Sequence, residues 1–301
     1  MARFEEVAAN RGVDSLIPGA EWMMIPSGGS NLVCLSNGVG FSVAEPPRGP
    51  KKLTIAAIPA NQIWGAIWGA IGSFLRPDTR VFRVSSNAGG ETTIEAKKGN
   101  LTATLKVSVH PRRSFKVAFF FLQDKDAAKK VTSRTAFTPP DGDGWIKGLN
   151  GVFGPQANIW FEKGKSEFFP VEDLGVTVGA AKDLPKLAEK HKGSGAPISI
   201  FLAGSKIESL DGNYPLGFFD STRKVIVVKD QFVADPWAGL PTPMLKTISH
   251  EIGHFMTDTR GGRGEGHDYF KSSGYRSDIL NTLDGGDIKI SRQRVLDWNP
   301  W

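Results

Sequence analysis

Three of the five histidines in this 301-residue chain fall between positions 250 and 267. The first two belong to the run His250-Glu251-Ile252-Gly253-His254, in which the histidines are four residues apart and a glutamate follows the first. Residues i and i+4 of a helix project from one face, so both imidazoles can reach one metal ion. Imidazole nitrogen is a good ligand for Zn²⁺. The spacing therefore predicts a zinc site, with the Glu251 carboxylate placed to act as a general base on water.

A catalytic zinc site needs a third protein ligand and an open coordination position. His267 is the strongest candidate, because the glycines between residues 261 and 266 allow the chain to leave the helix and fold back. Asp258 continues the i+4 series, but eight residues of helix would separate it from His250 by about 12 Å along the axis, so it is an alternative only if the helix ends early. The carboxylates that stay open as alternatives are Glu265, Asp268 and Asp278.

A helix ending near Asp258 must position these side chains. Thr242 can cap its first turn, Pro243 suits the first helical position, and Gly261-Gly262 supplies a stop. Apolar residues at helical spacing predict the buried face: Met244, Ile248, Ile252 and Phe255.

The chain before this helix, from Ser114 onward, predicts strands interspersed with helices, as in an α/β or α+β domain. Continuous apolar runs are typical of strands covered on both faces. Val225–Val228 is either an exposed edge strand that pairs with an extended substrate or an inner strand. The expected strands are 116–122, 158–162, 198–203 and 225–228, and the expected helices are 145–153 and 184–192.

The first hundred-odd residues predict a β-sandwich. Apolar and polar residues alternate through Leu101–Val109, which is the period of a half-buried strand. Shorter strands at 81–84 and 92–96 precede it, separated by Gly- and Asn-containing turns. The segment 80–110 resembles the closing strands of bacterial immunoglobulin-like domains. With a junction at Pro111–Ser114, we expect an immunoglobulin-like β-sandwich at 1–113 and a second domain at 114–301, in an α+β protein overall.

Composition restricts the classes of function. The net charge is +6, from 37 Lys and Arg against 31 Asp and Glu, and the basic residues are scattered. No basic patch is interleaved with aromatic residues, so we expect no nucleic-acid partner. The single cysteine, Cys34, excludes an intramolecular disulfide framework and a Cys-rich zinc finger. Nitrogen and oxygen atoms must therefore hold any metal.

One apolar segment, Leu53–Leu75, is long enough to span a bilayer. A proline and two amides between 59 and 62 interrupt it and leave about 13 apolar residues, fewer than a spanning helix needs. We therefore expect burial rather than membrane contact. Glu5 and Glu6 stand where a signal peptide would be apolar, so no cleavable signal is expected. We expect the protein to be cytoplasmic before export and secreted or extracytoplasmic afterwards. Export would then use a route that needs no cleavable signal peptide.

From Ser114 to Trp301 the chain resembles the metzincin-type zinc metallopeptidases. Their pattern is HExxH, a glycine three residues after the second histidine and a histidine six residues after it, followed by a methionine turn. Here the third histidine is displaced to His267, at 267 − 254 = 13 residues after His254. Gly274–Asn281 is similar to the methionine-turn segment, with Leu280 at the methionine position. Gly285–Gln293 resembles the start of the family's C-terminal helix.

The resemblance implies a mixed α/β peptidase domain that uses Zn²⁺ to hydrolyse peptide bonds in a protein or peptide substrate. It implies His250, His254 and His267 as metal ligands and Glu251 as general base. Tyr275, near the methionine turn, is the candidate donor to the developing oxyanion.

A β-sandwich fused to a cysteine-poor peptidase is similar to bacterial toxin-effectors. That similarity implies a secretion apparatus or a cognate immunity protein as partners. One alternative is a metallohydrolase acting on peptidoglycan cross-links, with the sandwich binding the cell wall. Another is a non-catalytic metal-binding adhesion protein.

Overall fold

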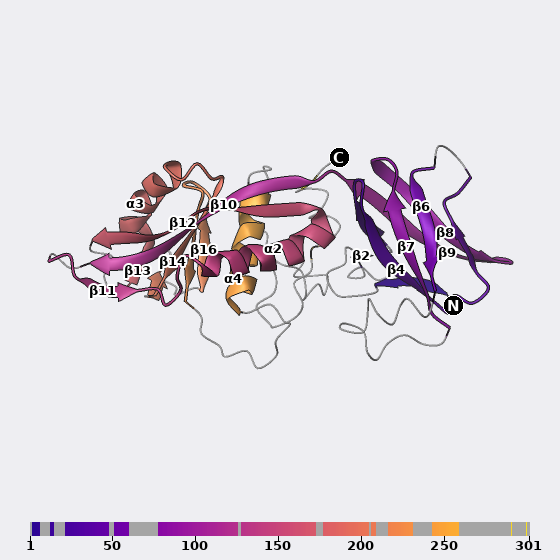
Figure 1. Cartoon of the computed structure of the whole chain (residues 1–301), viewed down its shortest axis with the longest axis horizontal. Helices are drawn as coiled ribbons and strands as arrows, with labels where there is room; N and C mark the ends of the chain where they lie inside the picture. The colour runs from indigo at the N-terminus through magenta and orange to yellow at the C-terminus, as the bar shows by residue number, and fades with distance from the viewer. Residues whose placement is uncertain are drawn as a thin grey trace.

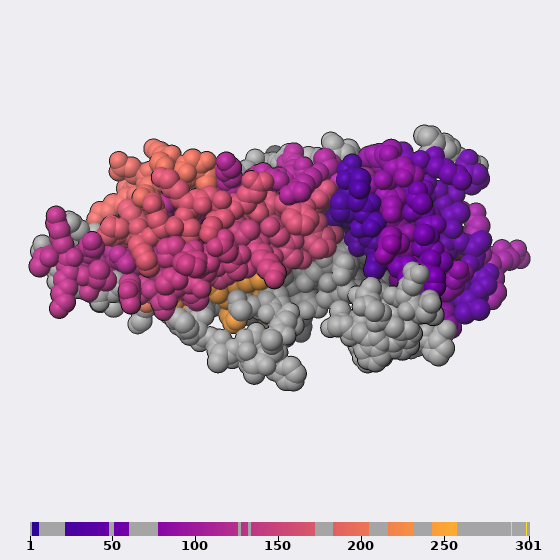
Figure 2. Space-filling model, in the orientation of Figure 1, coloured from indigo at the N-terminus to yellow at the C-terminus, as the bar shows by residue number. Residues whose placement is uncertain are grey.

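The computed structural model describes residues 2–6, 13–14, 22–47, 51–59, 78–125, 128–172, 177–204, 206–208, 216–230, 243–258, 290 and 299. Within them the chain forms two sheet-rich halves that lie end to end (Figures 1 and 2). Residues Pro111 and Arg112 alone separate the last strand of the first half from the first strand of the second. The mixed, sheet-rich architecture agrees with the expected α+β class.

The first half contains a five-stranded sheet in the order β2-β3-β9-β8-β5 and a four-stranded sheet in the order β1-β4-β7-β6. Side chains from both sheets, such as Ile25 on β3 and Phe82 on β7, share one core. Two sheets packed over a common core form a sandwich-like layer pair. The strands are β1 (Arg3–Glu6), β2 (Val13–Asp14), β3 (Trp22–Pro26), β4 (Ser30–Ser36), β5 (Ser42–Ala44), β6 (Leu53–Ile58), β7 (Arg80–Ser86), β8 (Gly90–Lys98) and β9 (Leu101–His110).

The second half is built on a six-stranded sheet in the order β11-β10-β14-β17-β16, with β12 also paired to β10. Strand β10 is parallel to β12 and β14, and β14 is parallel to β17. The outer strands β11 and β16 are antiparallel to their partners. The strands are β10 (Arg113–Lys125), β11 (Val131–Arg134), β12 (Ile159–Glu172), β14 (Ile198–Ala203), β16 (Gly217–Asp220) and β17 (Val225–Lys229); β13 (Thr177–Gly179) and β15 (Lys206–Glu208) pair separately.

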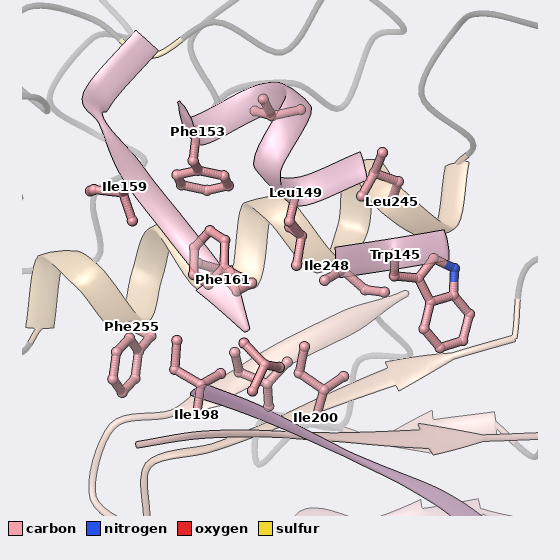
Figure 3. Packing of buried hydrophobic residues seen from close by; sticks show 14 of the residues in the cluster. Trp145, Leu149, Phe153, Ile159, Phe161, Ile198, Ile200, Leu245, Ile248 and Phe255 are labelled. Carbon is pink, nitrogen blue, oxygen red and sulfur yellow. The ribbon is translucent and has the colours of Figure 1, made fainter. Parts of the chain in front are cut away.

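Helices cover both faces of this sheet. Successive residues of β10 point to opposite faces, so Phe119 packs in one core and Phe120 in another. The first core includes α2 (Asp141–Ala157) and α4 (Pro243–Asp258), and the second includes α3 (Ala180–Lys192). Figure 3 shows residues of α2, β12, β14 and α4 pointing into the first core. Burial on both faces is the physical reason for the continuous apolar runs, as predicted.

Several elements are longer than their patterns predicted, and α2 and β12 are two of them. Helix α2 extends beyond 145–153 at both ends, and β12 continues to Glu172 rather than ending at 162. Gly148 weakens a helix as an isolated residue, but a Cβ there would lie 2.6 Å from a Leu245 side-chain carbon. The glycine therefore allows α2 and α4 to approach closely, a benefit that comes from tertiary packing.

The strand Val225–Val228 is an inner strand. Within β17, Ile226 is aligned with Ile200 of β14 on one side and with Phe219 of β16 on the other. The first of the two sequence-based alternatives, an edge strand, is therefore wrong for this segment. Strand β16 takes that outer position in the described part of the sheet.

The apolar segment 53–75 is only partly described. Its first residues form β6, and positions 60–77 lie outside the described residues. Of the helices that the structure describes, none is long and apolar enough to cross a membrane.

The two halves share apolar contacts. Trp22 and Met24 of β3 are buried in the first core of the second half, together with α2 residues such as Val152 and Phe153. Their neighbours Met23 and Ile25 point into the sandwich core. Strand β3 therefore contributes one face to each half, and the halves are in direct contact beyond the covalent junction.

Candidate metal centre

Helix α4 begins at Pro243 and continues through Asp258, as the pattern predicted. Its apolar stripe is buried in the core against the sheet and α2: Met244, Ile248, Ile252 and Phe255. The helix is thereby held along its whole length. Thr242 and Gly261-Gly262, the predicted start and stop signals, lie outside the described residues.

The structure brings His250 and His254 together. Their Nε2 atoms are 3.1 Å apart, their ring centroids are 4.7 Å apart, and both side chains are half-buried. Two nitrogens at tetrahedral positions around zinc, each about 2.05 Å from the metal, lie about 3.3 Å apart. The observed separation would subtend an angle of about 100° at such an ion. The separation of the two nitrogens is therefore close to that of two adjacent ligands of one zinc ion.

Glu251 lies against the edge strand beside these histidines. It is buried at 4% exposure, and burial raises its pKa to about 8. A Cβ built on Gly217 of β16 would lie 3.1 Å from Glu251 Oε1 and 2.8 Å from Thr247 Cγ2. Only a residue without a side chain fits between strand and helix at this point. The carboxylate is thus enclosed by β16 and α4, in an environment that penalises its ionised form unless a cation is near.

Strand β16, which packs against Glu251, is the element that the sequence patterns did not predict. Its alternate residues face opposite cores: Phe219 packs with the α4 face and Phe218 with the α3 face. The Phe219 and Phe255 rings meet edge to face at 5.9 Å. The short apolar run Gly217–Phe219 was the available signal, but nothing local places it beside Glu251.

His267, the expected third ligand, lies outside the described residues. The alternatives Glu265, Asp268 and Asp278 and the candidate oxyanion donor Tyr275 also lie outside them. Within the described ranges, no three His, Cys, Asp or Glu side chains form a metal-holding group. Position 258 belongs to α4, so its backbone is two helical turns beyond His250, as the spacing argument required.

The donor set and the geometry fit a zinc ion. Two imidazole nitrogens lie at a separation that suits two ligands of one ion, and the residue that follows His250 along the helix carries a carboxylate. Cys34 is buried in the other half, where its Sγ donates to the Glu5 carbonyl at 3.3 Å. The remaining ligands must therefore come from nitrogen or oxygen atoms.

No protein-family profile and no curated protein matches this chain. Among solved structures, domains 1–6 of the surface-layer protein SbsC are 17% identical, with a TM-score of 0.21 over 33% of this chain and 12% of that one. Domains 4 and 5 of SbsC are 19% identical, with a TM-score of 0.19 over 33% and 49%. A sialyltransferase from Photobacterium damsela is 5% identical, with a TM-score of 0.17 over 64% and 37%. The chain thus spans less than half the length of the SbsC structures it matches.

Proposed function

We propose that this chain is a zinc-dependent endopeptidase of metzincin-like type. The observation that carries the proposal is on α4, where the two imidazole Nε2 atoms lie 3.1 Å apart and the residue between them in sequence, Glu251, is buried. His250 and His254 would bind the ion, and His267 would be the third ligand. Zinc bound there would supply an activated water and polarise the scissile carbonyl.

Glu251 and Tyr275 would have distinct parts in hydrolysis. Glu251 accepts a proton at its carboxylate from the attacking water and delivers it to the leaving amide nitrogen. The enclosure of this carboxylate by β16 and α4 keeps bulk water from competing for it. Tyr275 would donate to the oxyanion.

Strand β16 supports a peptide as the substrate. Among the described strands it pairs with β17 alone. An extended chain added to such an outer strand would pair through backbone N–H and C=O groups. The Glu251 carboxylate lies against Gly217 of the same strand. A peptide paired along β16 would therefore run beside the general base.

The test is peptide hydrolysis by variants that keep the metal ligands intact. Glu251→Gln should retain bound zinc and lose at least about a thousandfold of the hydrolysis rate of a fluorogenic peptide library, because the amide cannot take up the proton. Glu189→Gln, at an exposed position on α3, is the matched control and should keep full activity. Unchanged activity in Glu251→Gln would remove Glu251 as the base, and no hydrolysis by the zinc-loaded wild type would refute the function.

A further inference from the structure

An exposed leucine directly precedes the strand that lies against Glu251. Leu216 is 49% exposed and is followed by Gly217, the first residue of β16. Because a Cβ on Gly217 would lie 3.1 Å from Glu251 Oε1, Leu216 adjoins the point where strand and carboxylate meet. An exposed apolar side chain beside a group that can act on a substrate suits contact with that substrate.

The backbone of β16 determines which of its polar groups an added chain would meet. The Lys229 N–H of β17 donates to the Leu216 carbonyl at 2.8 Å, so this carbonyl points toward β17. In a planar trans peptide the C=O and the following N–H point in opposite directions. The Gly217 N–H therefore points away from β17, and the Phe219 N–H does the same by the two-residue period of the strand. A peptide paired with β16 would bond to these two residues.

Side chains of β16 alternate between the two faces of the sheet. Phe219 packs in the core that contains α4, and Phe218 packs in the core that contains α3. By the same period, position 217 faces α4 and position 216 faces the α3 side. A substrate residue has its side chain on the same face as the strand residue opposite it. The residue opposite Gly217 would thus face Glu251, and its neighbour would face Leu216.

The charged groups of β16 and β17 on the α3 side are more distant from that neighbour or are already paired. Lys229 is opposite Leu216 on β17, so its backbone would be two strand spacings, about 10 Å, from an added peptide. Asp220, at the other end of β16, pairs with Arg223 at 2.9 Å. Among the described residues of these two strands, the one in register with the substrate residue is therefore the apolar Leu216.

The other end of the sheet has features that discourage an added strand. Strand β12 contains Lys163, Lys165 and Pro170, and a bulge interrupts its pairing with β10. Lysine, proline and bulges protect edge strands from pairing with other chains. The described residues of β16, Gly217–Asp220, contain none of the three. The difference favours β16, beside Glu251, as the strand that pairs with a substrate.

We propose that Leu216 is a specificity-determining residue, which selects peptides with an apolar side chain next to the residue that pairs with Gly217. The inference rests on the proposed peptidase function and narrows its substrate class. An apolar side chain packed against Leu216 removes apolar surface of both groups from water, whereas a charged side chain there would lose hydration against an apolar surface. Apolar residues at this one position therefore raise kcat/KM.

A fluorogenic peptide library scanned position by position with the zinc-loaded full-length protein tests this role. The wild type should prefer leucine or phenylalanine over glutamate at one position by at least about tenfold in kcat/KM. In Leu216→Lys that ratio should fall at least about tenfold, because a cation then faces the substrate side chain. Preferences at the two adjacent positions, whose side chains face α4, should stay as in the wild type.

The control and the conservative variant separate specificity from general damage. Leu101→Lys is the matched control, because Leu101 is 56% exposed at the start of β9 in the other half. It should keep the wild-type profile, as should Leu216→Met, which keeps an apolar side chain. Leu216→Asn replaces the lysine variant if that protein does not fold, and its apolar preference should disappear.

The outcomes distinguish this inference from the proposed function. A Leu216→Lys protein that cleaves peptides with the wild-type profile at every position would overturn the role of Leu216 and leave the peptidase function standing. A shift of the same size in Leu101→Lys would also overturn it, since the effect would then come from charge alone. A zinc-loaded wild type that hydrolyses no peptide would refute the peptidase function, and this inference with it.

Discussion

Gly217 and Glu251 define the proposed site at the scale of single residues. The histidine pair could be read from spacing, but the environment of the glutamate depends on a strand 34 residues earlier (251 − 217 = 34). Close approach between β16 and α4 buries the carboxylate and sets its distance from the strand edge. A residue whose only visible property is lack of a side chain is therefore as important to the site as a ligand.

Substitution of Gly217 by alanine tests this contact. The new Cβ would lie 2.8 Å from Thr247 Cγ2 and 3.1 Å from Glu251 Oε1, so strand or helix must move. We expect a loss of about 1–3 kcal/mol in the free energy of unfolding, with a large loss of peptidase activity. Urea denaturation and the peptide assay measure the two effects.

The matched control is Gly151→Ala on α2, where the added Cβ meets nothing within 4 Å. It should stabilise the helix by up to about 1 kcal/mol and leave activity unchanged. If Gly217→Ala behaves like Gly151→Ala, the close approach of β16 to Glu251 is not required.

At the scale of elements, local patterns predicted some boundaries and missed others. The apolar run Ile198–Ala203 matches β14, and the stripe of α4 matches its buried face, because each pattern repeats with the period of its own element. The far part of β12 has no such pattern. It mixes charged residues with Phe168, Phe169 and Val171, and its Lys163 and Glu167 make ion pairs with Asp143 and Lys190 of neighbouring helices. Such partners come from tertiary structure and are not visible locally.

The end of α2 allows a test of backbone conformation. The backbone of Asn158 has the left-handed conformation, which glycine adopts easily. Asn158→Gly would therefore keep this conformation and lose the side-chain hydrogen bonds to His110 and Trp160. Asn158→Ala would lose the same hydrogen bonds, and its Cβ would also make the left-handed conformation less favourable by about 1 kcal/mol. We therefore expect the alanine variant to be less stable than the glycine variant by roughly that amount in urea denaturation. Equal stabilities would show that the conformation contributes nothing.

Asp230, just after β17, predicts a pH dependence. It accepts hydrogen bonds from Thr135 Oγ1 at 2.6 Å and the Ala136 N–H at 2.7 Å, yet burial dominates and raises its pKa. The contribution of protonated Asp230 to the stability of the folded protein is fully present below the pKa of this residue in the unfolded chain, near 3.8. It is lost as the pH rises through the raised pKa that Asp230 has in the folded protein. The stability of the wild type relative to Asp230→Asn should therefore decrease from pH 3 to pH 6. Thermal unfolding across that range measures it, and a constant or increasing difference contradicts the assignment.

At the scale of the whole molecule, the halves are in contact through one shared strand and one polar cluster around the buried Asn299. Trp22 of β3 is buried with α2, while Asn299 contacts both sides of the linker. The sequence predicted a change of pattern near Pro111 but not these contacts. Nothing in the local sequence singles out His110, because burial at a junction depends on residues far away in the chain. The order of strands around β17, and hence the position of β16, is non-local in the same way.

Zinc content is the most direct test of the proposed centre. Purified wild-type protein, dialysed against metal-free buffer, should retain about one zinc per chain by inductively coupled plasma mass spectrometry, since a site with three protein ligands binds tightly. The double variant His250→Ala, His254→Ala should retain none, while His191→Ala, at a histidine outside the site, should match the wild type. A wild-type protein without stoichiometric zinc, or a double variant that keeps it, would contradict the assignment of α4 as the metal-binding helix.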